Sequence, residues 1–305
     1  MNAKVLITGS NGLLANKIKH DLCNSYDVVT LTTRKELVNQ SDVFFWDISK
    51  GIIDKEALLD CDYIIHLAGY SISNSWTTRN KARMYNSRIE GANLLFDKCV
   101  EFNVFPEMFI SASAIGYYDT KNCEHIYKEI DVPGNNWISK MVVDWEKAAD
   151  QFKQIRCKVT KLRISLLISR KGGILKSLLL PFHFYIGFIF SKGDQDVEWI
   201  HINDASRFVI HIIKNHYEFD NSIEGVFNLS ANRVTHLEFI KTIQSIFRPN
   251  SILINIPSWI LKFVFREQSK LFLNGCKVSS EKLSNTDFNI QFNDLHEAIE
   301  FEFSN

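Results

Sequence analysis

The sequence has no excess of charge of either sign and no hydrophobic run long enough to cross a membrane. Its 35 lysines and arginines balance 35 aspartates and glutamates, so the formal net charge is zero. A chain without a global field is not drawn to nucleic acid or to anionic lipid, and we expect neither as a partner. The apolar stretch at 174–190 is interrupted by Lys176 and Pro181, whereas a membrane span needs about 20 predominantly apolar residues. We interpret this stretch as a pocket wall or a partner surface.

The six cysteines lack the spacing of a metal site. They include no C-x-x-C pair and do not cluster with histidine as zinc requires, so no metal is expected. We interpret them as reduced thiols of a cytoplasmic protein. The apolar segment near the N-terminus is too short for a signal peptide, which agrees with that location. The cysteines lie at positions 23, 61, 99, 123, 157 and 276.

The pattern of apolar residues predicts an α/β fold. A hydrophobic content of 46% is enough for a large core. Short apolar runs alternate with helical patterns, which indicates a parallel sheet covered on both faces. We expect strands at 4–8, 27–31, 43–46, 63–67, 108–112, 158–164 and 225–230. We expect helices at 12–21, 77–102 and 136–154, and a later helix that begins with a capping box of Thr235 and Glu238.

The alternation of strands and helices falters after Ser165 and resumes further on, which suggests a domain organisation. We expect a nucleotide-binding domain of residues 1–170, to which residues 195–235 return. Residues 171–194 and 236–305 are expected to form a smaller C-terminal cap, or substrate region, across a cleft from that domain.

The most informative motif follows the first expected strand. Gly9 permits a tight turn, Gly12 lets backbone approach a pyrophosphate, and Ala15 allows the next helix to pack closely on the strand. The helix N-terminus is then free to receive phosphate charge. The pattern predicts a nucleotide-binding turn, whose candidate contact residues are Gly9, Ser10, Asn11, Gly12, Leu13 and Leu14.

Four motifs occur in the order found in one superfamily. They are Gly9 to Ala15, His66 to Gly69 (HLAG), Ser111 to Tyr118 (SASAIGYY) and Trp199 to Asp204 (WIHIND). In these motifs the chain resembles the extended short-chain dehydrogenase/reductases. Together with DWE at 144–146, KGGIL at 171–175 and the C-terminal SSEKLSNTDFNIQFNDLHEAI, they resemble one subgroup more closely. These are the NAD(P)-dependent epimerase/dehydratase-like proteins, some once labelled cell-division inhibitors, which end in a small domain of unknown function. The resemblance implies a Rossmann-type, doubly wound parallel sheet and nucleotide binding.

The residues after the second expected strand bear on the choice of cofactor. A carboxylate there accepts hydrogen bonds from the ribose of NAD, whereas a 2′-phosphate needs positive charge. Here Arg34 and Lys35 follow the strand, and in the resembling family the arginine fits NADP(H) rather than NAD(H). The other interpretation is a solvated basic pair. Asp47 and Ile48 fall where such folds approach adenine, and the aspartate could equally belong to a turn.

Two strand ends supply further candidates. The segment Leu67-Ala68-Gly69 follows the fourth expected strand, and its small residues let the ribose and phosphates pass close to the backbone. We interpret His66 before it as a packing residue. Ser113 follows the fifth expected strand, where ligands of such sheets bind. It is the best catalytic candidate, because its hydroxyl can hydrogen-bond a substrate carbonyl or alcohol. The alternative is a serine satisfied by turn backbone.

The usual partner of this serine is missing. In the superfamily a tyrosine and, four residues later, a lysine lie on the next helix, where the lysine lowers the phenol pKa. Here Ile138 and Val142 occupy those positions, and Lys140 points about 200° away around the helix. Tyr117 and Lys121 have the right spacing but lie on the loop directly after the fifth strand. Tyr117 can still reach a substrate and is the second catalytic candidate.

Two functions from different classes remain. The first is an NADP(H)-dependent oxidoreductase or epimerase-like enzyme that acts on a small carbonyl or hydroxyl compound. The second is an NADP(H)-binding sensor or interaction protein with little turnover. Ser87 takes roughly the place of an active-site asparagine, with Asn86 as the alternative, and joins the cofactor candidates. The apolar residues at 178–190, with Trp259 and Phe263 further on, supply enough surface for a hydrophobic substrate pocket or for the contact of a homodimer, and core packing is the default interpretation.

Overall fold

The computed structural model describes residues 2–38, 42–120, 124–219 and 221–304. The chain folds into two compact units. The first consists of Met1–Tyr117, Trp137–Arg163 and Ser206–Phe227, and the second of Tyr118–Asn136, Ile164–Ala205 and Asn228–Asn305. The expected cap segments, 171–194 and 236–305, both lie in the second unit. The division of function between nucleotide domain and cap stays a prediction.

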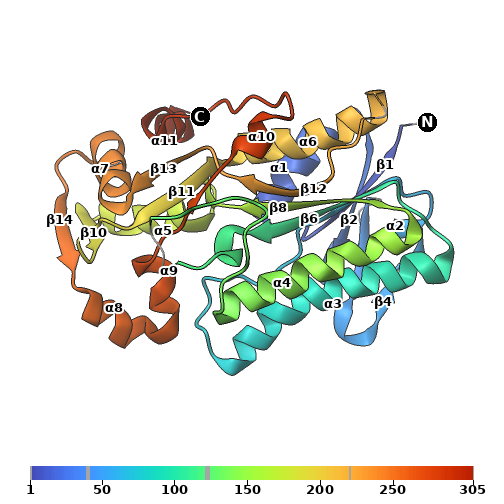
Figure 1. Cartoon of the computed structure of the whole chain (residues 1–305), viewed down its shortest axis with the longest axis horizontal. Helices are drawn as coiled ribbons and strands as arrows, with labels where there is room; N and C mark the ends of the chain where they lie inside the picture. Colours follow the sequence, from blue (N-terminus) through green and yellow to red (C-terminus); the bar gives the residue numbers. More distant parts are fainter. Residues whose placement is uncertain (1, 39–41, 121–123, 220, 305) are drawn as a thin grey trace. The chain divides into compact units, whose positions relative to one another are not determined.

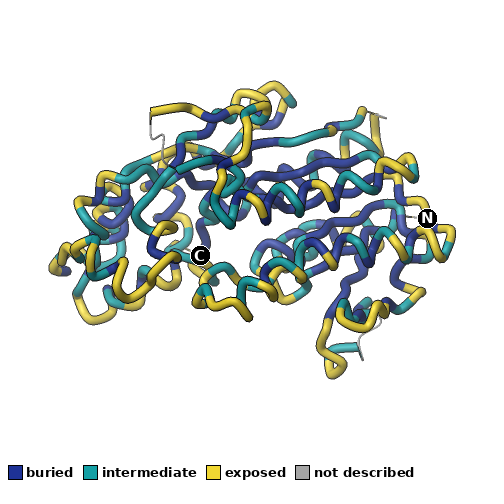
Figure 2. Tube along the Cα trace, turned by 60° about the horizontal axis from the view of Figure 1, so that its bottom comes forward, coloured by how far each residue is buried: buried dark blue, intermediate teal, exposed yellow. Residues whose placement is uncertain are grey.

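Among the described residues, the first unit is built on an eight-stranded sheet in the order β12-β8-β6-β5-β1-β2-β3-β4. The neighbours from β6 to β3 run parallel, and β4 returns antiparallel to β3. The central strands β1, β5 and β6 are buried at nearly every position (Figure 2), because both faces of the sheet are covered. The strands are β1 (Lys4–Thr8), β2 (Asp27–Thr32), β3 (Val43–Asp47), β4 (Ile52–Ile53), β5 (Tyr63–His66), β6 (Met108–Ala114), β8 (Lys158–Ile164) and β12 (Gly225–Leu229).

Helices cover both faces of this sheet. Figure 1 shows α3 (Thr78–Phe102) and α4 (Trp137–Asp150) side by side on one face, with α1 (Leu13–Leu22) and α6 (Ile202–Phe219) on the other. The long helix α3 begins where the Thr77 side chain accepts the Asn80 backbone N–H, and it ends at Asn103, whose φ of 54° is left-handed. The shorter elements are α2 (Lys55–Leu58), η1 (Lys35–Leu37), η2 (Ile48–Lys50), η3 (Ile115–Tyr117) and η4 (Gln151–Ile155).

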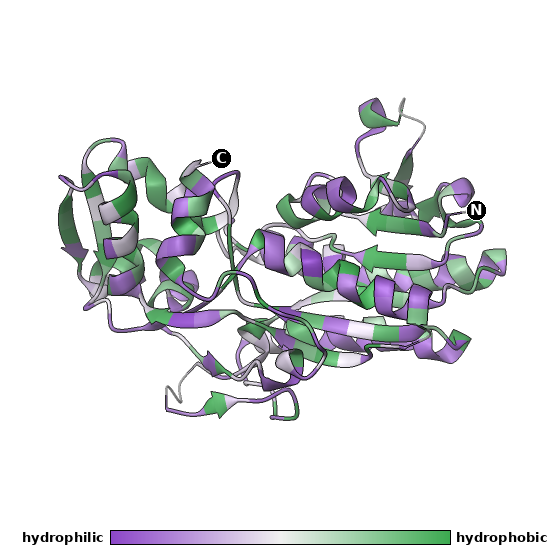
Figure 3. Ribbon diagram, turned by 90° about the horizontal axis from the view of Figure 1, so that it is seen from above, coloured by the Kyte–Doolittle hydropathy of each residue, from purple (hydrophilic) through white to green (hydrophobic). Residues whose placement is uncertain are grey.

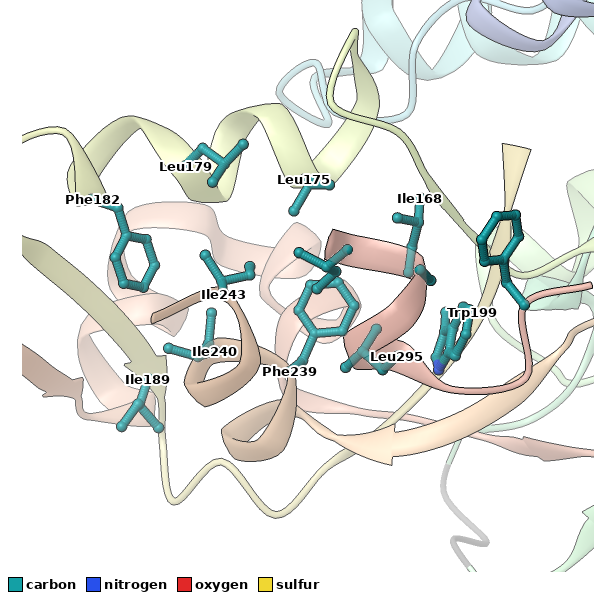
Figure 4. Packing of buried hydrophobic residues seen from close by; sticks show 13 residues of the cluster. Ile168, Leu175, Leu179, Phe182, Ile189, Trp199, Phe239, Ile240, Ile243 and Leu295 are labelled. Carbon is teal, nitrogen blue, oxygen red and sulfur yellow. The ribbon is translucent and has the colours of Figure 1, made fainter. Parts of the chain in front are cut away.

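The second unit has its own core. Its strands pair as β13-β11-β9, β10-β14 and β15-β7. Figure 4 shows apolar side chains of α5, α7 and the C-terminal helix α11 packed together, including Phe182, Ile243 and Leu295. The strands are β7 (Ile126–Tyr127), β9 (Leu166–Ile168), β10 (Ile186–Phe190), β11 (Asp196–His201), β13 (Asn232–Thr235), β14 (Ile252–Ile256) and β15 (Lys277–Val278). The helices are α5 (Gly173–Phe182), α7 (His236–Phe247), α8 (Ser258–Phe265), η5 (Arg266–Ser269), α9 (Lys270–Leu273), α10 (Glu281–Ser284) and α11 (Leu295–Ser304).

The structure confirms the expected parallel sheet, and each expected strand agrees with the observed one to within two residues at either end. The capping box of Thr235 and Glu238 is present at the start of α7. The helices carry hydrophilic and hydrophobic residues in alternation (Figure 3), as their periodicity predicts. The expected helix at 136–154 is divided into α4 and the 3₁₀ segment η4.

The apolar stretch at 174–190 forms α5 and β10 rather than one long helix. Leu175, Leu179 and Ile189 are buried in the core of the second unit, whereas Phe184 is 79% exposed. Most of its buried surface is therefore core packing. None of the helices in the described part of the chain is long and apolar enough to cross a membrane. Five cysteines are free thiols, and the sixth, Cys123, lies outside the described residues.

Candidate functional site

The carboxyl ends of neighbouring parallel strands lie level with one another at one edge of the large sheet. Thr8 at the end of β1 pairs in register with Leu31 of β2 and with His66 of β5. His66 in turn pairs with Ser111 of β6. The nucleotide turn, the Arg34 loop, the HLAG segment and the end of β6 therefore meet at this edge, where ligands of such sheets bind. The sequence predicts this grouping, because parallel strands end on the same side.

The turn between β1 and α1 fits the pyrophosphate of a dinucleotide. Gly9 has a φ of +76°, and a Cβ there would lie 2.9 Å from the carbonyl carbon and oxygen of Leu67, so only glycine fits. The first turn of α1 has no acidic residue, and Gly12 at its N-cap provides no side-chain cap. The N–H groups of that turn, at the positive end of the helix, can therefore receive an anion. Of the other predicted contacts, Asn11 is exposed, Ser10 and Leu13 are half-buried and Leu14 is buried.

A buried network holds the segment after β5 against this turn. The Thr8 hydroxyl accepts the backbone N–H groups of Leu67 and Ala68, both at 3.1 Å, and lies 3.0 Å from Nδ1 of His66. Nε2 of His66 lies 3.2 Å from the carbonyl oxygen of Arg88. We assign a neutral ring with its proton on Nε2, because Thr8 then donates to Nδ1 and every group is satisfied. Burial lowers the pKa of His66 to about 4, so this histidine packs and orients the segment, as the sequence indicates.

Arg34 and Asp47 differ in how they are engaged. Arg34 is exposed, and its backbone N–H donates to the Thr32 hydroxyl at 3.2 Å. Its guanidinium forms no ion pair with the described residues, which suits it to a phosphate. The Asp47 carboxylate accepts the backbone N–H and the hydroxyl of Ser49 at 3.1 and 2.6 Å, and these bonds lower the pKa of Asp47. Asp47 thus holds a turn, and its contact with adenine, like that of the half-buried Ile48, stays a prediction.

Ser113 and Tyr117, the two catalytic candidates, are joined through a buried ion pair. Ser113 is 4% exposed and lies one residue before the end of β6. Its hydroxyl donates to Oε1 of Glu146 on α4 at 2.6 Å. Nε and Nη2 of Arg163 on β8 donate to the same carboxylate at 2.8 and 2.9 Å. The Arg163 guanidinium carbon lies 3.4 Å from the ring centroid of Tyr117. The pair thus positions both candidates.

The roles of Glu146 and Arg163 are not predicted by the sequence motifs, although a signal for them exists. Lys161 and Arg163 occupy alternate positions in the buried part of β8, and a buried cation requires a partner. The partners are Asp150 and Glu146, which lie four residues apart on one face of α4. The sequence signal for these pairs is a strand with cations at alternate positions, preceded by a helix with two carboxylates four residues apart.

The positions of the usual tyrosine and lysine are apolar and packed. Ile138 lies against Gly116, where an added Cβ would come within 2.8 Å of the isoleucine Cγ2. Val142 is fully buried. Lys140 is exposed on α4, on a different face of the helix from the buried Val142. Lys121, which has the right spacing from Tyr117 for a sequence pattern, lies outside the described residues. Helix α4 therefore contributes Glu146 to this site in place of a tyrosine and a lysine.

The Ser87 side chain forms hydrogen bonds with two backbone groups. Its hydroxyl accepts the backbone N–H of Tyr70 at 2.8 Å and donates to the carbonyl of Met84 at 3.2 Å. It thereby ties the loop after β5 to α3. The neighbouring Asn86 is exposed. A contact of Ser87 with the cofactor stays a prediction.

A separate cavity of about 810 Å³ lies at the opposite, amino edge of the sheet. Its lining includes Lys4, Asp27, Asp62, Tyr63 and Glu107, which lie at or just before the starts of strands. Burial raises the pKa of Tyr63 above its ordinary value. The described residues hold no cluster of histidine, cysteine and carboxylate suited to a metal ion. Since ligands of open α/β sheets bind at the carboxyl edge, we place the functional site there.

Comparison with known proteins agrees with this geometry. Residues 5–229 match the NAD dependent epimerase/dehydratase family, and residues 256–302 match a domain of unknown function, DUF1731. The second match confirms the subgroup that the C-terminal sequence indicates. The chain is 30% identical over 301 residues to an epimerase family protein of Staphylococcus saprophyticus and 27% identical over 301 residues to one of Staphylococcus aureus, with 97% of each protein covered.

Two solved structures share the fold. The human epimerase family protein SDR39U1, crystallised with NADPH, has a TM-score of 0.84 and 24% identity, with 99% of each chain covered. The UDP-glucuronic acid 4-epimerase of Bacillus cereus, crystallised with UDP-glucuronic acid and NAD, has a TM-score of 0.80 and 19% identity, covering 99% of this chain and 98% of that one. The family match extends over the whole sheet and the site at its carboxyl edge. The chain therefore belongs to the NAD dependent epimerase/dehydratase family.

Proposed function

We propose that the chain binds NADP(H) and acts as an epimerase-like oxidoreductase on a small carbonyl or hydroxyl compound. The Gly9 turn and the uncapped N-terminus of α1 support a dinucleotide pyrophosphate at the sheet edge. The exposed Arg34 supports a 2′-phosphate, and NADPH in the human relative agrees with it. Leu67, Ala68 and Gly69 are the proposed contacts of the ribose and phosphates. Residues 171–194 and 236–305 are the proposed substrate region. The proposed location of the protein is the cytoplasm.

The hydrogen bond from Ser113 to Glu146 is the main observation in support of enzymatic activity. Because the serine donates its one proton to Glu146, its oxygen is left to accept a hydrogen bond from a substrate alcohol. When bound, the nicotinamide takes up or supplies a hydride. During oxidation, Ser113 Oγ takes the alcohol proton as its own proton passes to Glu146 Oε1, and reduction reverses both transfers. Tyr117, stacked on Arg163, is the proposed hydrogen-bond donor to the carbonyl oxygen.

Rapid-mixing measurements of NADPH oxidation over a panel of aldehydes, ketones and quinones test this proposal. Ser113→Ala and Tyr117→Phe should each lower turnover about 10²- to 10⁴-fold, because each removes a positioned proton or donor. NADPH affinity should change by no more than about twofold, because neither side chain is assigned to the cofactor. Ser111→Ala is the matched control, since that buried hydroxyl donates only to the carbonyl of Ala112. Turnover that is unchanged in both variants would remove these residues from the mechanism.

The apolar positions on α4 favour a second candidate function. With Ile138 and Val142 in place of the usual tyrosine and lysine, the chain would bind NADP(H) as a sensor or interaction protein with little turnover. Tight NADPH binding together with no oxidation above the buffer rate for any compound would support this second function against the first. The apolar residues at 178–190 would then serve the contact with a partner or a second copy.

A further inference from the structure

Arg88 is a partly buried cation without a carboxylate partner. Its Nη1 donates to the carbonyl oxygens of Tyr70 and Met84 at 2.9 and 3.0 Å. Its Nε is buried and has no hydrogen-bond partner, and the arginine forms no ion pair with the described residues. Burial lowers the pKa of Arg88 to about 10, which leaves it charged at neutral pH. Carbonyl oxygens fix the guanidinium but do not neutralise its charge.

The comparison with Arg163 shows what Arg88 lacks. Arg163 presents Nε and Nη2, the same edge of the guanidinium, to both oxygens of Glu146. In Arg88 this edge has no protein acceptor, because only Nη1 is engaged. A charge removed from water is costly unless it is paired and hydrogen-bonded. The Nε–Nη2 edge is also the one that binds carboxylate or phosphate through two parallel hydrogen bonds.

The surroundings of Arg88 place this edge in the candidate site. A Cβ added to Gly69 would lie 2.9 Å from the guanidinium carbon, so the charge rests directly on the segment proposed to contact the cofactor. The ring of Trp145 lies 5.0 Å from the guanidinium carbon, and its Nε1 is also buried without a partner. Trp145 is three residues from Val142 on the buried face of α4. Arg88 therefore brings a cation beside the stretch of helix where the usual lysine is replaced.

We propose that Arg88 binds an anionic oxygen group, a phosphate or a carboxylate, of the molecules that occupy this site. The inference rests on the proposed function and deepens it, because it assigns a charge to the ligand. The anionic group belongs either to the pyrophosphate of the dinucleotide or to an anionic substrate. Affinities measured for NADPH and for small anions distinguish these two sources.

The test is calorimetric titration of the whole protein, as wild type, Arg88→Met, Gly69→Ala and the control Arg79→Met. Arg79 lies on the same helix but is exposed, so its replacement should change every affinity by less than about twofold. Gly69→Ala keeps the arginine and displaces its guanidinium, since the new Cβ would come within 2.9 to 3.2 Å of that group. The ligands are NADPH, adenosine 2′-monophosphate, which has the 2′-phosphate but neither phosphate of the pyrophosphate, and inorganic phosphate and oxalate with and without NADPH.

If the dinucleotide supplies the anion, Arg88→Met weakens NADPH binding at least tenfold, which corresponds to the loss of charged hydrogen bonds, and changes the affinity for adenosine 2′-monophosphate by no more than about twofold. If the substrate supplies it, NADPH affinity is kept, and phosphate or oxalate binding to the NADPH-loaded protein weakens at least tenfold. Gly69→Ala should reproduce the loss of phosphate and oxalate binding without NADPH, which does not depend on the proposed contact of Gly69 with the cofactor, so the test survives if Arg88→Met fails to fold. Affinities within twofold of wild type for every ligand, with only the melting temperature changed, would make Arg88 a structural clamp and overturn the proposal. A wild type that binds no NADPH contradicts the proposed function instead, and the phosphate and oxalate titrations without NADPH still decide the role of Arg88.

Discussion

The buried ion pair between Glu146 and Arg163 allows a quantitative prediction of stability. We consider Glu146→Leu, Arg163→Met and the double variant, which exchange charged side chains for apolar ones of similar size. The side chains are 9% and 2% exposed and are joined by hydrogen bonds of 2.8 and 2.9 Å. Each single replacement leaves the other charge buried without a partner of opposite charge. It should therefore lower the free energy of unfolding by about 3–5 kcal/mol.

The double variant should be much less destabilised than the sum of the single variants. It removes both charges together, and apolar replacement of a buried pair is often close to neutral. Ser113 loses its acceptor in both the single Glu146 variant and the double variant, so that cost cancels in the cycle. We therefore expect a coupling energy of at least about 3 kcal/mol between positions 146 and 163.

Urea denaturation followed by tryptophan fluorescence measures the four free energies of unfolding. The matched control is the exposed pair of Lys128 and Glu281, which is also in close contact at 2.9 Å, with side chains 57% and 65% exposed. The same cycle with Lys128→Met and Glu281→Leu should give a much smaller coupling energy, because solvent screens the pair. A coupling at positions 146 and 163 no larger than this control would refute the argument from burial.

Three further predictions follow from other parts of the chain. NADPH should bind at least tenfold more tightly than NADH, a difference of about 1.4 kcal/mol, and Arg34→Ala should remove most of it; equal affinities by calorimetry would reject the role of Arg34. Since the pKa of His66 falls to about 4 in the fold, the unfolded chain takes up its proton first as the pH drops below about 6.5. Urea denaturation from pH 7 to pH 4 should therefore show a loss of about 3 kcal/mol that is reduced in His66→Gln, and an equal loss in that variant would assign it to other groups. Thr235→Ala should cost about 1 kcal/mol through loss of the α7 cap. Thr242→Ala on the same helix, whose hydroxyl only returns to the Glu238 carbonyl, should cost less than about 0.5 kcal/mol; equal effects in the two variants would contradict the capping argument.

The fold class and the place of the site follow from local features of the sequence. Apolar runs of strand length separated by helical periodicity predict parallel pairing, and parallel strands end at one edge. Gly9 requires the turn that the motif indicates, because its φ of +76° and the nearby carbonyl of Leu67 exclude a side chain. The capping box of Thr235 and Glu238 is likewise local, since both partners lie within one helical turn. Such features are readable because the interacting residues are close in the sequence or share a fixed period.

The partners of the catalytic candidates were decided by the tertiary structure alone. Ser113 meets Glu146 across 33 positions, and Glu146 meets Arg163 across 17, through the packing of α4 on β6 and β8. The same packing leaves the Nε of Arg88 without an acceptor although carboxylates are common in the chain. Spacing along the chain cannot specify which buried charge finds a partner, because that depends on the angle and distance at which helices cross the sheet. Burial makes these contacts energetically important. The free energies of a paired and an unpaired charge differ little in water and strongly in a protein interior.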